Sequence, residues 1–477
     1  MLKYNIILPA SLILLLIHPV MYIPVIYGFY HYRDRLEEEI QYYCEVDSKW
    51  FFFLPFSIYA IIYISTIPLP YDDMLRHAVS YQFNYDYSNL FVHSQLKPTI
   101  NLWIGTEVLA GKITDLVGKE YSIRILQYLT IAVYLAVFIK AIHKLLGDNK
   151  NKWIIITVLV LVVLSTTVSI RITAARPELY SATWLMSAVF LHPAIWTIIG
   201  ILLIPTYWLM PIYICGVLLL KTTFHKKILI STLLILFSYI FWHMYSEGEY
   251  IHNILLIKEW FNNRIMGVGE NKTLLFQIFD ISVFIIISML FISFTKNKAI
   301  DKKHIIEFTV VIIIFLLPDM TRYITTVIPL IIFIIAININ HTEFNLNNKT
   351  KFIIFLLAIY IAKDAGNMSG KIASQRADFI LPKNSVVLTE FNDSLYSTIF
   401  HNPNIKIAPS MEIGATDKNI QQLVVDISIN NSLNCDELVK HDFTHIIEGS
   451  LNMVGTPTCL DLVEAKGKWK LWKVIYE

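Results

Sequence analysis

The sequence predicts an all-α polytopic membrane protein that carries a small α/β domain near its C-terminus. Of 477 residues, 55% are hydrophobic and 16% are charged, whereas about 25% are charged in an average soluble domain. Apolar runs with almost no charge recur along the chain, among them IIITVLVLVVL and ISVFIIISMLFISF. Runs of this kind are typical of membrane-spanning helices. After residue 366 the pattern changes to short apolar runs separated by polar segments, which is typical of a small α/β domain.

We predict about ten spans from the length and apolar character of these runs. Three prolines interrupt residues 183–220, so this stretch is either one long bent crossing or three short ones. Prolines also leave open whether residues 6–30 cross the membrane completely. The predicted spans are 6–30, 50–68, 123–143, 153–170, one or more within 183–220, 228–246, 274–294, 304–318, 323–339 and 351–364.

Short lysine-containing loops such as HKLLGDNKNK and TKNKAIDKKH indicate the cytoplasmic side, because positive residues remain inside. The outer face then holds the loop 69–122, the loop 247–273 and the C-terminus. We therefore predict a transmembrane domain over 1–365 and an outer-face α/β domain over 366–477. The latter contains Cys435 and Cys459, and whether they form a disulfide depends on an oxidising compartment.

The outer loop 69–122 contains two segments with apolar residues at helical spacing, DDMLRHAVSYQF and NLWIGTEVLAGKITDLVG. Each is predicted to be an amphipathic helix lying along the membrane surface. The formal net charge of +2 comes with no basic stripe or tail, which argues against a nucleic-acid partner. No cysteine or histidine spacing resembles a metal site.

Two adjacent carboxylates, Asp72 and Asp73, follow the second predicted span in STIPLPYDDMLRH. Pro68 and Pro70 end that span, so the carboxylates fall at the start of the first surface helix. They either cap this helix, as acidic residues at helix N-termini do, or form a catalytic site at the membrane boundary. Arg76 lies within one turn and is predicted to pair with either aspartate. Such pairing keeps a carboxylate ionised, which suits a base or a metal ligand.

A second candidate is Arg322, followed by Tyr323, in the short outer turn of PDMTRYITTVIPL. It is either a snorkelling arginine beside an interfacial tyrosine or a binder of an anionic head group, because a guanidinium donates in a fork to phosphate. There are weaker candidates on the outer side, for which an exposed loop charge or interfacial anchor is the favoured interpretation. They are Arg176, Arg264, Glu247 and His243.

Taken together, these features resemble the GT-C superfamily of integral-membrane glycosyltransferases, which use polyprenyl-phosphate sugars. The resemblance covers the architecture of the whole chain, but only a few residues of motif: Tyr71-Asp72-Asp73 and the late Arg322-Tyr323 followed by Pro329. In length and in the small outer domain, the chain is similar to bacterial and phage-borne enzymes that modify O-antigen, a part of lipopolysaccharide, or other glycans of the cell envelope.

The resemblance implies a hexosyl- or pentosyltransferase that moves a sugar from a polyprenyl-phosphate donor to a hydroxyl of an envelope glycan or lipid-linked acceptor. Asp72 or Asp73 would act as the base. Asp72 is favoured, with Asp73 orienting it or binding an ion, and inversion at the anomeric carbon is expected. Arg322, with Arg264 or Arg176, would stabilise the leaving phosphate. A divalent cation (Mg or Mn) held by the two aspartates is left open. The residues expected to support the site are Arg76, Tyr323, Glu247 and His243.

The same resemblance implies an inner-membrane protein with its active site on the periplasmic side of a bacterial cell. Two alternatives remain from the sequence. One keeps the superfamily and changes the acceptor, giving an oligosaccharide ligase or polymerase or a protein glycosyltransferase. The other is a non-enzymatic transporter or flippase. Against the transporter, the ionisable residues cluster at one interface and no internal repeat is evident.

Overall fold

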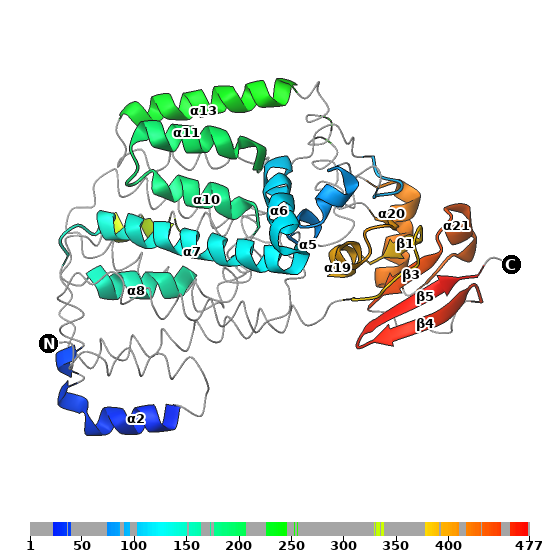
Figure 1. The fold of residues 1–477 in the computed structure, drawn as a ribbon, viewed down its shortest axis with the longest axis horizontal. Coiled ribbons are helices and arrows are strands. Elements are labelled where there is room, and N and C mark those ends of the chain that lie inside the picture. Colours follow the sequence, from blue (N-terminus) through cyan, green and yellow to red (C-terminus); the bar gives the residue numbers. More distant parts are fainter. Residues whose placement is uncertain are drawn as a thin grey trace.

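The computed structural model has a mainly helical region joined to a five-stranded sheet near the C-terminus (Figure 1). The structure describes residues 22–35, 37–39, 74–85, 90–95, 103–149, 152–163, 172, 176–206, 226–245, 252, 255, 329, 331–333, 335–337, 377–390, 393–409, 416–430, 432–449 and 458–475.

Several helices fall on predicted spans. Helix α7 (Lys119–Leu145) contains the whole of the predicted span 123–143, and it is the helix in the described part that is long and apolar enough to cross a membrane. Helices α2 (Tyr22–His31), α8 (Lys152–Val163) and α13 (Lys226–Tyr245) overlap three further predicted spans. The predicted spans that lie outside the described residues are 50–68, 274–294, 304–318 and 351–364.

The proline-interrupted stretch begins as two separate helices, α10 (Glu178–Ser187) and α11 (Pro193–Leu203), followed by the 3-10 turn η4 (Ile204–Thr206). Pro193 occupies the first turn of α11, where its missing N–H costs no hydrogen bond. Trp184 and Trp196 join the two helices, since their rings stack 4.3 Å apart and each indole N–H donates to the other residue's carbonyl. Residues 207–220 lie outside the description, so the number of crossings here stays open.

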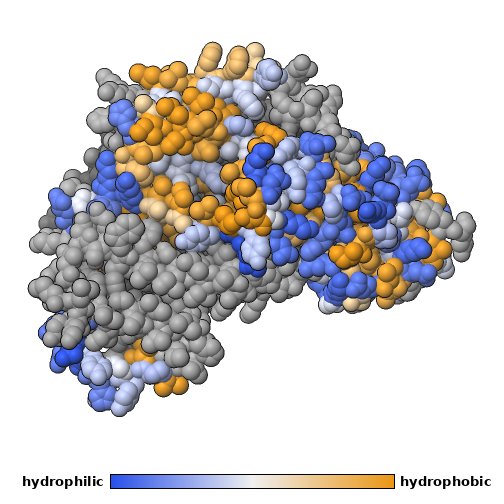
Figure 2. Space-filling view, viewed as in Figure 1, coloured by the Kyte–Doolittle hydropathy of each residue, from blue (hydrophilic) through white to orange (hydrophobic). Residues whose placement is uncertain are grey.

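Helices α11 and α13 pack together and turn apolar side chains outward. Gly200 lets α11 approach closely, because a Cβ there would lie 2.7 Å from Ile235 and 2.9 Å from the Trp184 ring. Leu202 and Phe237 remain 69% and 73% exposed, and the surface over these helices is strongly hydrophobic (Figure 2). A contiguous apolar surface of this kind suits contact with lipid.

The first predicted surface helix, over 72–83, differs from expectation. Instead of one amphipathic helix, the chain forms the short helix α5 (Met74–His77) and the 3-10 turn η2 (Ser80–Phe83). All four residues of α5 are buried. The Ser80 hydroxyl donates to the carbonyl of His77 at 3.0 Å, which supports the bend. The periodicity of this segment predicts a surface helix, but periodicity does not reveal that Arg76 has partners inside the protein.

The second predicted surface helix forms as α6 (Ile104–Val117), but the side that it buries is not its apolar side. Its buried side chains are small or polar, and they are Thr106, Glu107, Ala110, Gly111 and Thr114. Its exposed side chains include Leu109 and Leu116, the latter 83% exposed. The small and polar residues of this face therefore point into the protein, whereas Leu109 and Leu116 are exposed beside Lys112 and Asp115.

The sheet has the strand order β2-β1-β3-β5-β4. Strand β1 is parallel to both β2 and β3, whereas β5 is antiparallel to β3 and β4. The apolar runs SVVLTEF, IKIAPS and THIIEGS contain strands, whereas QLVVDI lies in a helical segment. The closing KGKWKLWKVIYE forms part of the terminal hairpin. The strands are β1 (Val386–Thr389), β2 (Lys406–Ala408), β3 (His445–Glu448), β4 (Leu460–Lys466) and β5 (Trp469–Val474).

We call the described residues between 377 and 475 the sheet unit. Its core places helices α20 (Lys418–Val425) and α21 (Cys435–Lys440) against the sheet, with Leu423 and Leu438 meeting Ile446 and Trp472. Helix α19 (Asp393–His401) lies between the sheet and α5 (Figure 1). The predicted domain boundary at residues 365 and 366 lies outside the description and stays a prediction.

Cys435 and Cys459 form a disulfide that links the start of α21 to the chain entering β4. Their sequence separation is 24 residues. A cross-link that closes a loop of this length restricts the unfolded chain and stabilises the fold by about 3 kcal/mol.

We predict that Cys435→Ser and Cys459→Ser each lower the free energy of unfolding of the sheet unit by about 3 kcal/mol, because the loop is no longer closed. Denaturant titration of the purified full chain, followed by the fluorescence of its tryptophans, measures this change. Wild-type protein treated with a reductant should behave like the variants. Equal stability of oxidised and reduced protein would contradict the prediction.

Candidate functional site

Helix α5 buries two side chains that bear hydrogen-bonding or charged groups, directly after Asp72 and Asp73 in the sequence. Arg76 is 1% exposed and His77 is fully buried. The helix packs against α6 on one side and α19 on the other. A buried guanidinium is costly unless counter-charges and acceptors surround it, so the partners of Arg76 decide whether this arrangement is stable.

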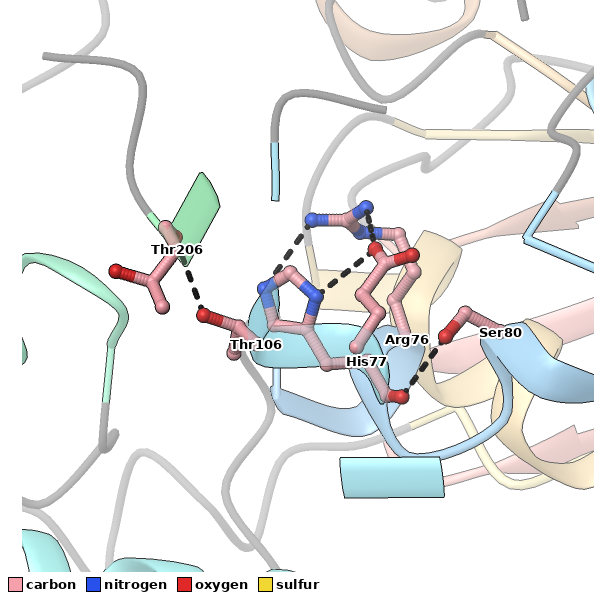
Figure 3. A network of polar contacts seen from close by, with 6 residues as sticks. Arg76, His77, Ser80, Thr106 and Thr206 are labelled. Carbon is pink, nitrogen blue, oxygen red and sulfur yellow. Dashed lines mark hydrogen bonds and ion pairs between the residues drawn. The ribbon is translucent and has the colours of Figure 1, made fainter. Parts of the chain in front are cut away.

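The described counter-charge is Glu107, supplied by the buried face of α6. Arg76 Nη1 lies 2.9 Å from Glu107 Oε1, and His77 Nδ1 lies 3.0 Å from the same oxygen. Arg76 Nη2 lies 3.3 Å from His77 Nε2, which closes a ring of three contacts. Figure 3 shows Arg76 and His77 pointing toward one another within this network.

The contacts determine the protonation state of His77. A neutral ring donates from Nδ1 to the Glu107 carboxylate and accepts at Nε2 from Arg76, whereas a protonated ring would set two donors against each other. Burial, followed by the neighbouring Arg76 charge, lowers the pKa of His77 to about 4, although Glu107 acts in the opposite direction. His77 is therefore neutral at physiological pH and bridges a cation and an anion.

Further contacts hold the cluster in place. The Arg76 guanidinium carbon lies 4.8 Å from the centre of the Trp103 ring, a cation–π distance. Thr106 donates to the Thr206 carbonyl at 3.1 Å, which ties α6 to η4 (Figure 3). Thr114 donates to the carbonyl of Ala78 at 3.1 Å and so ties α6 to the turn after α5. Hydrogen bonds on both sides therefore fix α6 and the α5 segment relative to each other.

Arg176 is the candidate phosphate binder that the structure describes, and it lies just before α10. Its positive charge contributes to the lowered pKa of His77, so it lies within electrostatic reach of the cluster. The sequence separates Arg176 from His77 by almost a hundred residues. The fold thus brings a second arginine toward the segment that follows the two aspartates.

The other sequence candidates are not placed by the described residues. His243 belongs to α13 as a backbone position, but its side chain lies outside the description. The predicted pairing of Arg76 with an aspartate stays a prediction. The described partner of Arg76 is Glu107. The candidates that lie wholly outside are Asp72, Asp73, Arg264, Arg322, Tyr323 and Glu247.

Sequence reasoning missed Glu107. The signal was present, because Thr106, Glu107, Ala110, Gly111 and Thr114 repeat at helical spacing and form a narrow face without large apolar residues. A carboxylate on such a face can approach another backbone closely. The face of small and polar residues is the one that packs inward.

The metal question concerns Asp72 and Asp73 alone. Within the described ranges, no group of three histidine, cysteine or acidic side chains is arranged to hold a metal ion. Glu107 and His77 are engaged with Arg76. A cation at the two aspartates therefore stays a prediction.

We predict that Glu107→Gln lowers the free energy of unfolding by about 3 kcal/mol or more, because it leaves the buried Arg76 without its described counter-charge. Denaturant titration of the detergent-solubilised protein measures the change. Asp115→Asn on the exposed side of the same helix is the matched control, with an expected effect within about 0.5 kcal/mol. Equal effects of the two substitutions would contradict this account.

We also predict a pH dependence from His77. Its folded pKa of about 4 lies below the ordinary value of 6.5, so between these values the unfolded chain binds a proton that the folded chain does not. The free energy of unfolding should therefore fall as pH drops from about 6.5 to 4, by roughly 3 kcal/mol in total.

Denaturant titrations at several pH values measure this slope. His77→Gln should remove its share of the slope. An identical pH dependence in wild type and His77→Gln would contradict a buried neutral His77.

Comparisons with known proteins agree with this architecture. No protein-family model matches the chain, and no curated protein matches its sequence. Among solved structures, ArnT from Cupriavidus metallidurans in the apo state is similar over 87% of this chain and 96% of its own, with a TM-score of 0.50 and 11% sequence identity. The chain therefore shares its overall fold with this ArnT.

Proposed function

We propose that this protein transfers a sugar from a polyprenyl-phosphate donor to a hydroxyl of an envelope glycan or lipid-linked acceptor at the outer membrane interface. The observation that carries the proposal is the buried cluster of Arg76, His77 and Glu107. Arg76 and His77 follow Asp72 and Asp73 within one short segment, in a chain whose fold is similar to that of ArnT. A short helix locked by charge is the rigid support that a catalytic carboxylate needs.

The proposed reaction gives each residue the role that the resemblance to the GT-C superfamily implies. The acceptor hydroxyl attacks the anomeric carbon, a new C–O bond forms, and the bond from that carbon to the phosphate oxygen breaks. The hydroxyl proton passes to Asp72, oriented by Asp73. The polyprenyl phosphate leaves with its negative charge stabilised by Arg322 and by Arg264 or Arg176. Attack opposite the leaving group inverts the anomeric centre.

Two features support the outer, periplasmic placement of this site. The Cys435–Cys459 disulfide indicates an oxidising compartment for the sheet unit. Helix α5 packs directly on α19 of the same unit, so the segment after the aspartates shares its side of the membrane. The bacterial inner membrane satisfies both conditions, because its periplasmic face is oxidising.

Transfer assays with different donors and acceptors identify the sugar and the acceptor. ArnT is a 4-amino-4-deoxy-L-arabinose transferase, so a pentosyl donor of that type and a hexosyl donor are the first pair to compare. The acceptors to compare are O-antigen, other envelope glycans and lipid-linked oligosaccharides. Transfer of whole oligosaccharides instead would support the ligase or polymerase alternative.

We predict that Asp72→Asn, Asp73→Asn and Arg322→Ala each lower the rate of sugar transfer by about 100-fold or more, because they remove the base, its neighbour and the phosphate ligand. The full chain is reconstituted in nanodiscs with a radiolabelled polyprenyl-phosphate sugar and extracted acceptor glycan.

Glu120→Gln, at the exposed start of α7, serves as the matched control and should retain the wild-type rate. Transfer at the wild-type rate by all three site variants, with normal expression, would contradict the proposed site. Movement of the intact donor across the bilayer without transfer would instead favour a flippase.

A further inference from the structure

The sheet unit is bound to the segments that follow the proposed catalytic residues. Helix α19 lies directly against α5, and all seven of its residues from Ser394 to Phe400 are buried. Ser394, Ser397 and Thr398 are among them, and such small side chains allow another helix to approach closely. Figure 1 shows the resulting order of layers, from the sheet through α19 and α5 to α6.

A second contact fastens α19 to the membrane-spanning helix α7. Lys119, the first residue of α7, donates from Nζ to the carbonyl of Phe400 at 2.7 Å. The same ammonium lies 4.5 Å from the centre of the Phe400 ring. Because Phe400 is in the last turn of α19, the cation also interacts favourably with the negative end of the helix dipole.

A third contact adds the outer loop to the sheet itself. Val92 donates its N–H to the carbonyl of Ile407 at 3.1 Å, and Ile407 donates to the carbonyl of Leu90 at 2.8 Å. Phe91 thereby forms a parallel bridge with Ile407 of β2. Leu90 and Phe91 are buried at this edge. The outer loop thus continues the sheet beyond β2.

From these three contacts we propose that the sheet unit positions α5, and with it Asp72 and Asp73, and that Lys119 is a positioning residue for sugar transfer. This inference rests on the proposed function. Helix α5 has only four residues, too few to hold itself in place. It is held by α6 on one side and α19 on the other, and α19 is held by Lys119.

In this proposal the sheet unit holds α5 in place, which a separate binding module would not do. Loosening α19 would displace the carboxylates relative to a bound donor without removing any group that touches it. A displacement of about 1 Å can cost on the order of 100-fold in rate. The expected signature is therefore a lower kcat with little change in KM for the donor.

We predict that Lys119→Met lowers kcat on the order of tenfold, with the donor KM changed less than about twofold. Lys119→Arg should restore most of the rate, because a guanidinium also donates to a carbonyl and stacks on a ring. Lys112→Met, at an exposed position of α6, is the matched control. All variants are measured as full chains in nanodiscs, with the donor concentration varied.

Val92→Pro tests the edge contact separately, since proline removes the N–H that bonds to Ile407. Val92→Ala keeps that N–H and is its control. The inference predicts a reduced kcat for Val92→Pro and a rate near wild type for Val92→Ala. Wild-type kcat in both Lys119→Met and Val92→Pro would overturn it.

Measuring Asp72→Asn in the same assay separates the positioning role of Lys119 from the proposed catalytic role of the aspartates. If Asp72→Asn abolishes transfer while Lys119→Met and Val92→Pro transfer normally, the positioning role is wrong and the proposed function stands. If Asp72→Asn also transfers normally, the proposed catalytic site itself is wrong. If Lys119→Met raises the donor KM while kcat is unchanged, the residue acts in binding and the positioning role is overturned.

Discussion

The ion pair between Arg76 and Glu107 is the interaction on which the rest of this arrangement depends. Both side chains are almost completely buried and lie 2.9 Å apart, so neither charge is stable there without the other. The pair requires that α5 and α6 remain in contact. His77 strengthens this requirement, because as a neutral ring it connects the guanidinium and the carboxylate. The outer loop therefore has one favoured arrangement around this pair.

From this pair outward, each layer constrains the next. Thr106 joins α6 to η4, at the end of the proline-broken helices. On the other side, α19 covers α5, and Lys119 connects α19 to the long helix α7. Membrane helices and sheet unit thus meet at one short helix. Asp72 and Asp73 precede that helix directly in the sequence, and the proposed transferase site depends on this support.

Much of the architecture could be predicted because it depends on local patterns. Helix α7 and strands β1 and β3 could be predicted from the apolar pattern of their own residues. The prediction of one surface helix over 72–83 was wrong, because the structure of this segment depends on residues distant in the sequence. Arg76 and His77 look like the polar face of a surface helix until Glu107, some thirty residues later, provides a buried acceptor. The periodicity of residues 72–83 taken alone carries no information about such a pairing.

The central claim is that a lipid-linked sugar binds beside Asp72 and Asp73 on the side of the sheet unit. A cryo-EM structure of the full chain with a non-transferable polyprenyl-phosphate sugar analogue tests it most directly. The account predicts the anomeric carbon within about 4 Å of an aspartate carboxylate, with the phosphate on the side of Arg322. An analogue whose head group lies at the cytoplasmic ends of the helices, far from both aspartates, would contradict it.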